Sequence, residues 1–114
     1  LKVLKKFNSQ YSFSVTNYSH PIQRSFTIKK NNKLKILYPH HYTSRSQDLD
    51  ISFHDAGQFY WGLSDTWLRN KRLISRDSFP VVMPRNRVQD IDTIEDWEIA
   101  ERIFKTKDKK NFLF

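Results

Sequence analysis

Alternation of apolar and polar residues is strongest in residues 11–16, which read Tyr-Ser-Phe-Ser-Val-Thr. This alternation of strand-forming residues predicts a strand. Residues 57–62 form an aromatic stretch bracketed by the only two glycines, and residues 80–84 hold two valines and a methionine between two prolines. Both stretches are predicted to be short strands.

Residues 25–38 carry the pattern of a β-hairpin. Phe26 and Ile28 alternate on one arm, and residues 30–33 supply a Lys-Asn-Asn-Lys turn, in which asparagine tolerates a positive φ. The other arm alternates Leu34, Ile36 and Tyr38, and the outward positions hold Lys29, Lys33 and Lys35. A two-stranded hairpin is marginal by itself, so this one needs a surface to lie on, either the rest of the chain or a second subunit.

Helical patterns separate these strands. Residues 1–7 are predicted to be the end of a helix, residues 48–54 a short helix or helical turn, and Ser64 the N-cap of another helix. Thr93 is predicted to begin the last helix, with Asp96 three residues on as a variant of the capping box. Helices interleaved with strands predict an α/β fold.

Composition places the chain in the class of single small domains. It has 114 residues, 38% of them hydrophobic and 15% aromatic, which argues against simple disorder. The absence of cysteine excludes a disulfide scaffold, a thiolate zinc site and a cysteine nucleophile. No apolar run approaches the roughly 20 residues of a membrane helix. We therefore expect a soluble, cytoplasmic chain without membrane contact, and its start at Leu1 rather than Met indicates a fragment.

The net charge of +8 is unevenly distributed. Residues 1–47 contain lysines and arginines but no acidic residue. Most acids of the last 25 residues lie between Asp90 and Glu101. A basic half favours anionic partners such as nucleic acid, nucleotide phosphates or an acidic sugar, although a solvated basic surface explains it equally well. Bases and aromatic residues lie in different segments, which disfavours single-stranded nucleic acid as the partner.

Residues 90–92, Asp-Ile-Asp, are a candidate metal site. Two aspartates separated by one residue can put both carboxylates on one side of an extended stretch. Mg²⁺ commonly takes one or two carboxylates together with phosphate oxygens and water. A bare Asp-x-Asp is common, however, and Asp92 and Asp96 also stand where a helix dipole favours acids. Metal binding and helix capping both remain open from these residues alone.

Two further stretches could bind an anionic or polar ligand. Arg45, two residues before Gln47, can fork onto a carboxylate or phosphate, or it can be a surface arginine before a turn. Small residues beside the aromatic stretch 57–62 allow a ligand to approach the backbone, or they belong to an ordinary packed strand. The four histidines have no i, i+4 spacing on a convincing helix, so we expect no zinc site.

Taken in order, the motifs resemble the C-terminal half of the CMP-nonulosonate synthetases, the acylneuraminate cytidylyltransferase family. The residues that carry the resemblance are Ser12–Thr16, Pro21–Arg24, Arg45–Leu49, Asp55–Gly62, Val88–Thr93 and Glu95–Trp97. The stretches Pro-Ile-Gln-Arg and Asp-Ala-Gly-Gln-Phe-Tyr-Trp-Gly are most similar to the pseudaminic acid branch. Each motif alone is weak, but their common order over nearly the whole chain is a strong signal.

The resemblance implies a Rossmann-like nucleotidyltransferase fold of the GT-A-like kind, a homodimer and a Mg²⁺-dependent reaction. CTP and a nonulosonic acid sugar would give the CMP-sugar and pyrophosphate. Mapped onto this chain, the metal ligands are Asp90 and Asp92, and Arg45 joins them as a catalytic residue. The implied substrate-binding residues are Arg24, Gln47, Asp48, Asp55, Gln58 and Tyr60. Sialic acid enzymes of the family often have Asn at the position of Asp55, which implies a differently substituted sugar.

Two larger features also follow from the resemblance. Residues 21–45 match an arm that embraces the partner subunit and brings basic residues to its active site. The family's Gly-rich, basic loop that cradles CTP has no counterpart among these 114 residues, which contain two glycines. We therefore expect residues 1–114 to be the C-terminal portion of one cytidylyltransferase domain, inactive alone. The alternatives are a small basic nucleic-acid-binding module and a dimerisation module without catalysis.

Overall fold

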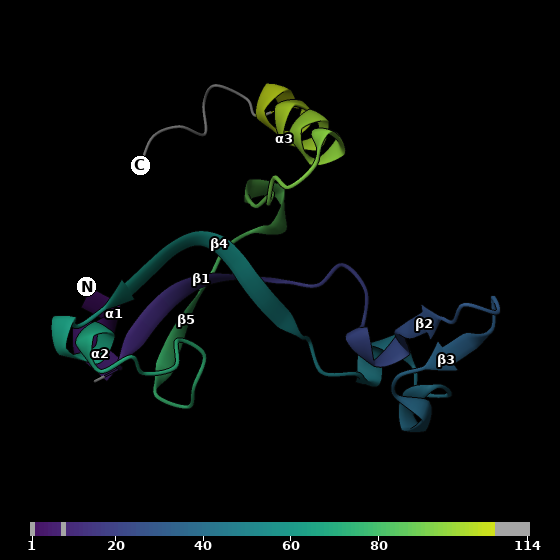
Figure 1. Cartoon of the computed structure of the whole chain (residues 1–114), viewed down its shortest axis with the longest axis horizontal. Coiled ribbons are helices and arrows are strands. Elements are labelled where there is room, and N and C mark those ends of the chain that lie inside the picture. Colours follow the sequence, from purple (N-terminus) through teal and green to yellow (C-terminus); the bar gives the residue numbers. More distant parts are fainter. Residues whose placement is uncertain (1, 8, 107–114) are drawn as a thin grey trace. The chain divides into compact units, whose positions relative to one another are not determined.

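The computed structural model describes residues 2–7 and 9–106 of the chain. They divide into two compact units, of which one runs up to Thr16 and resumes at Asp55, and the other is Asn17–His54. A three-stranded sheet contains β4 (Phe53–Gly62), β1 (Tyr11–Asn17) and β5 (Ser78–Val82), and a two-stranded ribbon contains β2 (Phe26–Ile28) and β3 (Leu34–Ile36) (Figure 1). In the described part of the chain, no helix combines the length and apolarity needed to span a bilayer.

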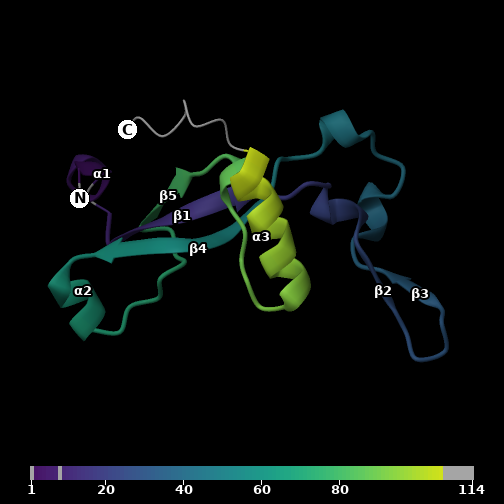
Figure 2. The ribbon, with the colours of Figure 1, turned by 90° about the horizontal axis from the view of Figure 1, so that it is seen from above.

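The three-stranded sheet has β1 (Tyr11–Asn17) at its centre, flanked by β4 (Phe53–Gly62) and β5 (Ser78–Val82), as Figure 2 shows. β1 and β5 are parallel, with Tyr11 opposite Ser78. β4 runs in the opposite direction, so the sheet is mixed (Figure 1). All three predicted strands are confirmed, and β4 begins four residues before the predicted one.

Residues 11–16 of β1 are buried throughout. A central strand is covered on both faces, so its hydroxyl side chains lie inside with their hydrogen bonds made. Thr16 Oγ1 donates to the carbonyl oxygen of Met83 at 3.0 Å. Alternation of apolar and hydroxyl residues therefore marks a buried strand here and not a strand with a solvent face.

One end of β1 is tied to helix α2 (Ser64–Leu68) by the side chain of Tyr11. The Tyr11 hydroxyl donates to the carbonyl oxygens of Thr66 at 3.2 Å and Lys71 at 3.0 Å. Its ring packs edge-on against Trp67, with ring centroids 4.8 Å apart. Gly62 lies against this pair, and a Cβ atom there would approach both Trp67 Nε1 and the Tyr11 ring to 2.6 Å. Only glycine fits at this contact.

Gly62→Ala is accordingly expected to destabilise the protein by about 1–3 kcal/mol, the usual effect of overpacking. The added methyl group has to displace two aromatic side chains, one of which is held by two hydrogen bonds. The urea concentration at half-unfolding, followed by tryptophan fluorescence, measures the effect. An unchanged midpoint would contradict the close approach of Tyr11 to Gly62.

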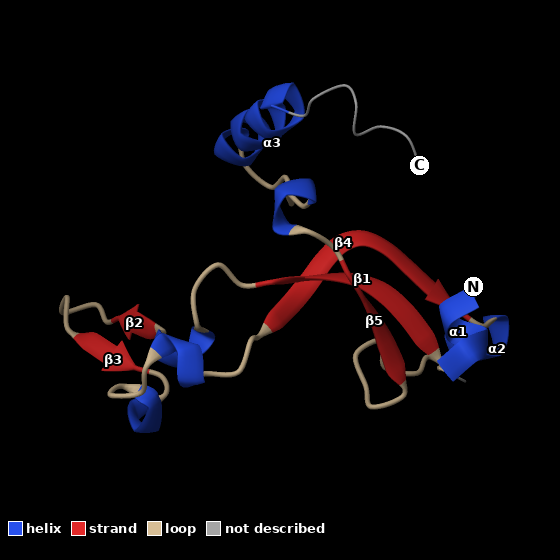
Figure 3. Cartoon of the chain, turned by 180° about the vertical axis from the view of Figure 1, so that it is seen from behind, coloured by secondary structure: helices blue, strands red, loops and turns tan. Residues whose placement is uncertain are grey.

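Three predicted helices are confirmed, and two other predictions about helices are wrong. α1 (Lys2–Phe7) and α3 (Ile94–Thr106) lie where helices were expected (Figure 3). α2 also forms, but Leu63 occupies its N-cap position and no side chain caps it, so the prediction of Ser64 as N-cap is wrong. The predicted helix over 48–54 is also wrong, because only a 3-10 turn at Ser46–Asp48 is present and Phe53 begins β4.

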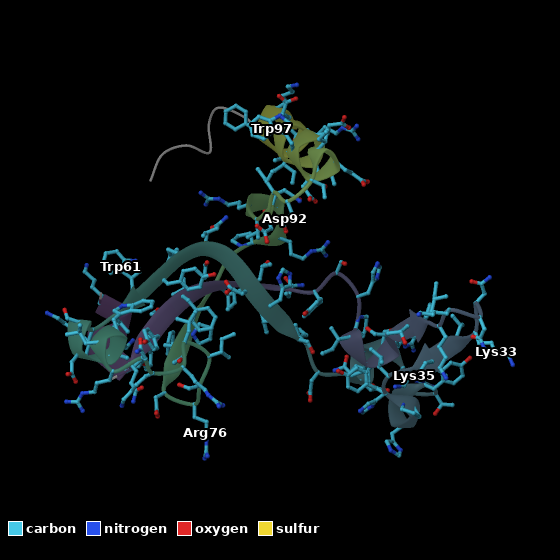
Figure 4. The ribbon with its side chains drawn as sticks, viewed as in Figure 1. Lys33, Lys35, Trp61, Arg76, Asp92 and Trp97 are labelled. Carbon is cyan, nitrogen blue, oxygen red and sulfur yellow. The ribbon has the colours of Figure 1, made fainter. Side chains whose placement is uncertain are left out.

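The unit Asn17–His54 contains the predicted hairpin. β2 (Phe26–Ile28) and β3 (Leu34–Ile36) pair antiparallel with Phe26 opposite Ile36, and the turn has Asn32 at a φ of 59°. The apolar side chains of both strands are exposed, as Ile28 at 69% and Leu34 at 60% illustrate. Figure 4 places Lys33 and Lys35 on the same hairpin. The described residues thus form a mixed α/β structure, as expected, while the Rossmann-like topology stays a prediction.

Candidate functional site

The first group of candidate residues lies on β4, around a break in its regular geometry. Residues five apart on a regular strand point to opposite faces. Gly57 has a φ of +65°, however, which reverses the alternation locally and lets Asp55 and Tyr60 meet. The Tyr60 hydroxyl donates to Asp55 Oδ2 at 2.7 Å, and the Gly57 amide donates to Asp55 Oδ1 at 2.8 Å. Both carboxylate oxygens of Asp55 are therefore oriented by the strand itself.

Ser14, on the neighbouring strand β1, supports this break from beneath. Its side chain is fully buried, and its Oγ accepts hydrogen bonds from the amides of Gln58 at 3.0 Å and Phe59 at 3.3 Å. These two amides follow directly on Gly57, where the strand departs from regular pairing. Sequence reasoning missed Ser14 as a site residue. The only signal available was a hydroxyl residue in the middle of an otherwise strongly β-forming stretch.

Ser14→Ala is expected to destabilise the protein by about 1–3 kcal/mol, because it leaves two partly buried amide groups without this acceptor. The loss should appear as a lower midpoint of thermal unfolding. Ser14→Thr keeps the hydroxyl and serves as the comparison, although its extra methyl group has to fit a fully buried position. An Ala variant as stable as the parent protein would contradict the assigned support of β4.

The carboxyl-terminal side of β5 approaches the same part of β4. Gln58 Nε2 donates to the carbonyl oxygen of Arg87 at 2.6 Å, within the 3-10 turn Arg85–Arg87 that precedes Asp90. The pKa of Tyr60 is raised, first by the hydrogen bond to Asp55, then by burial, and then by the negative charges of Asp55 and Asp90. The charge of Asp90 thus acts on Tyr60, so the predicted metal residue and the predicted sugar residues share one environment.

Asp90 and Asp92 are exposed, and Asp92 lies just before helix α3 (Figure 4). The sequence left open whether Asp92 caps helix α3, and in the structure Asp96 makes the capping hydrogen bonds with Thr93. Asp96 Oδ2 accepts from the amide of Thr93 at 2.9 Å, and Thr93 Oγ1 accepts from the amide of Asp96 at 3.2 Å, which confirms the predicted capping box. The hydrogen bonds from Thr93 lower the pKa of the Asp96 carboxyl, its side-chain hydroxyl first.

The donor set at residues 90–92 fits a magnesium ion that is shared with a substrate. Among the described residues, no group of three or more His, Cys, Asp or Glu is arranged to hold a metal ion. Two exposed carboxylates remain, and Mg²⁺ is commonly bound by one or two carboxylates plus substrate phosphates and water. The residues are compatible with the predicted metal, and the assignment of Asp90 and Asp92 stays a prediction.

The other candidate residues belong to the unit Asn17–His54. A guanidinium nitrogen of Arg24 donates to the carbonyl oxygen of Ser44, directly before Arg45, and Gln23 Nε2 donates to the carbonyl oxygen of Asp50 at 3.1 Å. These bonds hold the 3-10 turn Ile22–Arg24 against the segment containing Ser46–Asp48. Arg45, Gln47 and Asp48 are exposed on that segment. Arg24 and the Arg-Ser-Gln-Asp motif therefore form one neighbourhood.

A pocket of about 390 Å³ opens beside Arg24, lined by Gln23, Arg24, Phe26, Ile36 and Tyr42. Gln23 Oε1 is buried without a hydrogen-bond partner, as found within residues 2–7 and 9–106. The structure therefore assembles the predicted residues into two groups. Asp55, Gln58, Tyr60 and Asp90 share the first, and Arg24, Arg45, Gln47 and Asp48 the second.

Comparison with known proteins gives three informative relatives, although no family model matches the chain. It is 42% identical over 104 residues to a pseudaminic acid cytidylyltransferase of Campylobacter jejuni serotype O:2, and 41% identical to its counterpart in serotype O:23/36. It is 26% identical over 106 residues to a Helicobacter pylori protein named pseudaminic acid cytidylyltransferase and UDP-2,4-diacetamido-2,4,6-trideoxy-beta-L-altropyranose hydrolase.

These alignments include most of the present chain and less than half of each relative. They cover 91% of the chain and 45% of either Campylobacter protein, and 93% of the chain and 20% of the Helicobacter protein. The names of the relatives are those of the branch that the sequence motifs indicated. The resemblance stated from the motifs is therefore confirmed.

Proposed function

We propose that these residues form the sugar-binding part of a cytidylyltransferase that joins CMP to a nonulosonic acid, with pseudaminic acid as the preferred sugar. The observation that carries the proposal is 42% identity over 91% of the chain to a protein named for this activity. In the reaction, the anomeric hydroxyl oxygen of the sugar bonds to the α-phosphorus of CTP. The bond from that phosphorus to the bridging oxygen breaks, pyrophosphate leaves, and the hydroxyl proton is lost.

Asp90 and Asp92 are the residues that would hold Mg²⁺. A bound magnesium ion supplies neutralisation of the charge that develops on the phosphate oxygens as pyrophosphate leaves. Both side chains are exposed before substrate arrives. Because Asp96 caps α3, neither of them is needed as the helix cap. The Gln58 side-chain amide donates to the carbonyl oxygen of Arg87 and so anchors the turn that precedes these residues.

In this proposal the sugar is recognised by charge and by polar groups. Arg24 and Arg45 would neutralise its carboxylate or a phosphate group, since guanidinium groups bind both in a forked geometry. Gln47 and Asp48 extend this surface. The Asp55 carboxylate and the Tyr60 hydroxyl, which are bonded to one another, would line the sugar pocket from β4. The hydrogen bond to Asp55 raises the pKa of Tyr60 and engages its proton, so the Tyr60 oxygen would accept a hydrogen bond from the sugar.

The active protein is proposed to be a homodimer in which residues 21–45 reach the partner subunit. The hairpin in this range has an exposed apolar side, with Phe26 at 54% and Ile28 at 69% exposure. A two-stranded ribbon with an uncovered apolar side is marginally stable in water, and a second copy would cover it. The basic residues Lys29, Lys33 and Lys35 then reach an anionic substrate on the partner.

The proposal is tested by assaying pyrophosphate release from CTP with pseudaminic, legionaminic and neuraminic acids. The assay uses the complete protein encoded by the gene and, in parallel, residues 1–114 alone. Turnover of pseudaminic acid by the complete protein, and none by residues 1–114, is the expected result. Turnover by residues 1–114 alone would contradict the predicted dependence on an additional CTP-binding loop. Failure of the complete protein with all three sugars would overturn the proposed function.

A further inference from the structure

We propose that Asp96, acting together with Gln89, is a positioning residue that holds the segment Asp90–Asp92 in shape for the metal and nucleotide. The inference rests on the proposed function of Asp90 and Asp92. Asp96 is not assigned as a metal ligand or as a substrate-binding residue. Its role is to fix the backbone on both sides of the two carboxylates, so that they are pre-oriented when Mg²⁺ and CTP arrive.

The hydrogen bonds of Asp96 reach both sides of the segment. Asp96 Oδ1 accepts from Gln89 Nε2 at 3.2 Å, directly before Asp90. Asp96 Oδ2 accepts from the amides of Asp92 at 3.3 Å and Thr93 at 2.9 Å. Gln89 Nε2 also donates to the carbonyl oxygen of Asp90 at 2.8 Å. One carboxylate and one amide group thus close a small ring of contacts around residues 90–92.

Helix capping alone does not account for this arrangement. A capping box needs the reciprocal pair between Thr93 and Asp96, and that pair is present. The bonds from Gln89 and from the Asp92 amide are additional to it, and they act on the loop and not on the helix. Asp96 and Gln89 are half-buried, whereas Asp90 and Asp92 are exposed. The residues of the network are therefore less exposed than the two carboxylates whose backbone they hold.

Pre-orientation matters because Asp90 and Asp92 carry like charges on a short loop. The two carboxylates repel each other, and without a fixed backbone they would move apart. The free energy needed to bring them together and order them would then oppose metal binding. Residues that orient metal ligands through hydrogen bonds commonly change metal affinity about 10–100-fold when they are mutated. Both Asp96 oxygens are already engaged by N–H and O–H donors, including Thr93 Oγ1 on Oδ2 at 2.6 Å. Asp96 is thus placed to orient and not to ligate.

The test uses the complete enzyme with Asp96→Ala, Asp96→Asn and Gln89→Ala, and follows the Mg²⁺ dependence of turnover and Mn²⁺ binding by electron paramagnetic resonance in the presence of CTP. Asp96→Ala is expected to raise the concentration of either metal at half-saturation about 10-fold or more, with turnover partly recovered at high Mg²⁺. Asp96→Asn should show a smaller loss, because its amide oxygen can still accept from Thr93 while its NH₂ group cannot accept from Gln89.

Ala100→Gly is the control for helix stability. It weakens the interior of α3, eight residues beyond Asp92, so it should lower the unfolding midpoint and leave metal affinity unchanged. If Asp96→Ala lowers stability to the same extent but binds Mn²⁺ as well as the parent enzyme, Asp96 is a cap only and the inference is overturned. If Asp96→Ala does not fold, Gln89→Ala decides, since Gln89 lies outside the capping box; unchanged metal affinity there also overturns the inference.

Failure of the inference differs from failure of the proposed function. If Asp90 and Asp92 do not bind the metal, their own substitution leaves Mn²⁺ binding and Mg²⁺-dependent turnover intact. If they do bind it but Asp96 has no positioning role, only the Asp96 and Gln89 variants behave like the parent enzyme.

Discussion

Replacing Asp90 or Asp92 by Asn in the complete enzyme is expected to lower Mg²⁺-dependent turnover by about 10³-fold, the scale of losing a principal group that stabilises charge in phosphoryl transfer. Asparagine keeps the size of the side chain but removes the negative charge that an oxygen-seeking cation requires. Both residues are exposed, so the folded structure should be retained. Pyrophosphate release measured over a Mg²⁺ titration gives the loss, and thermal unfolding checks the fold.

Glu98→Gln supplies a matched control for these variants. Glu98 is an exposed acid on α3, paired with Arg102 at 3.5 Å, and loss of such a surface ion pair changes stability by about 0.5 kcal/mol or less. Its substitution removes one negative charge near the same helix without touching residues 90–92. If the Asn variants retain the parent enzyme's Mg²⁺ dependence, the metal is held elsewhere and the assignment of both aspartates is wrong.

The strands were predictable because their patterns are local. Residues 11–16 and 57–62 are rich in strand-forming side chains, and the turn of the hairpin has Asn32 in the left-handed region that asparagine tolerates. The incorrect helix over 48–54 shows the limit of the same reasoning. Leu49, Ile51 and Phe53 alternate with polar residues, and this period of two agrees with the strand that begins at Phe53.

The site was predictable only in part, because its geometry depends on contacts between distant residues. The motifs identified Asp55, Gln58 and Tyr60, and the structure brings them together on β4. No local pattern showed that Ser14 would accept two amides from a strand more than forty residues later, at 3.0 Å and 3.3 Å. The capping box suggested a helix start at Thr93. The additional bond from Gln89 to Asp96 became visible only once the loop between them was folded.

Arg45→Ala in the complete enzyme is expected to lower kcat/KM for the sugar by about 10²-fold, because an arginine that pairs with a carboxylate or phosphate contributes roughly 2–3 kcal/mol in a site shielded from water. Arg45 is exposed at the N-cap of the turn Ser46–Asp48 and has no structural hydrogen bond assigned to its side chain among the described residues. Stability should therefore remain near that of the parent enzyme, as thermal unfolding would show. Arg76→Ala, which removes an exposed arginine from the other unit, is the matched control.

A mixing experiment asks whether Arg45 acts on its own subunit or on the partner. Arg45→Ala and Asp92→Asn subunits are each nearly inactive as homodimers, but in a mixed dimer the arm of one and the aspartates of the other can complete one of the two sites. Random exchange of equal amounts should then restore about a quarter of the parent activity, since half of the dimers are mixed and each has one intact site. If Arg45 serves its own subunit, every site in the mixture carries one defect and no activity returns. Restoration thus requires both a dimer and an arm that crosses between subunits, which stability measurements on either variant alone cannot reveal.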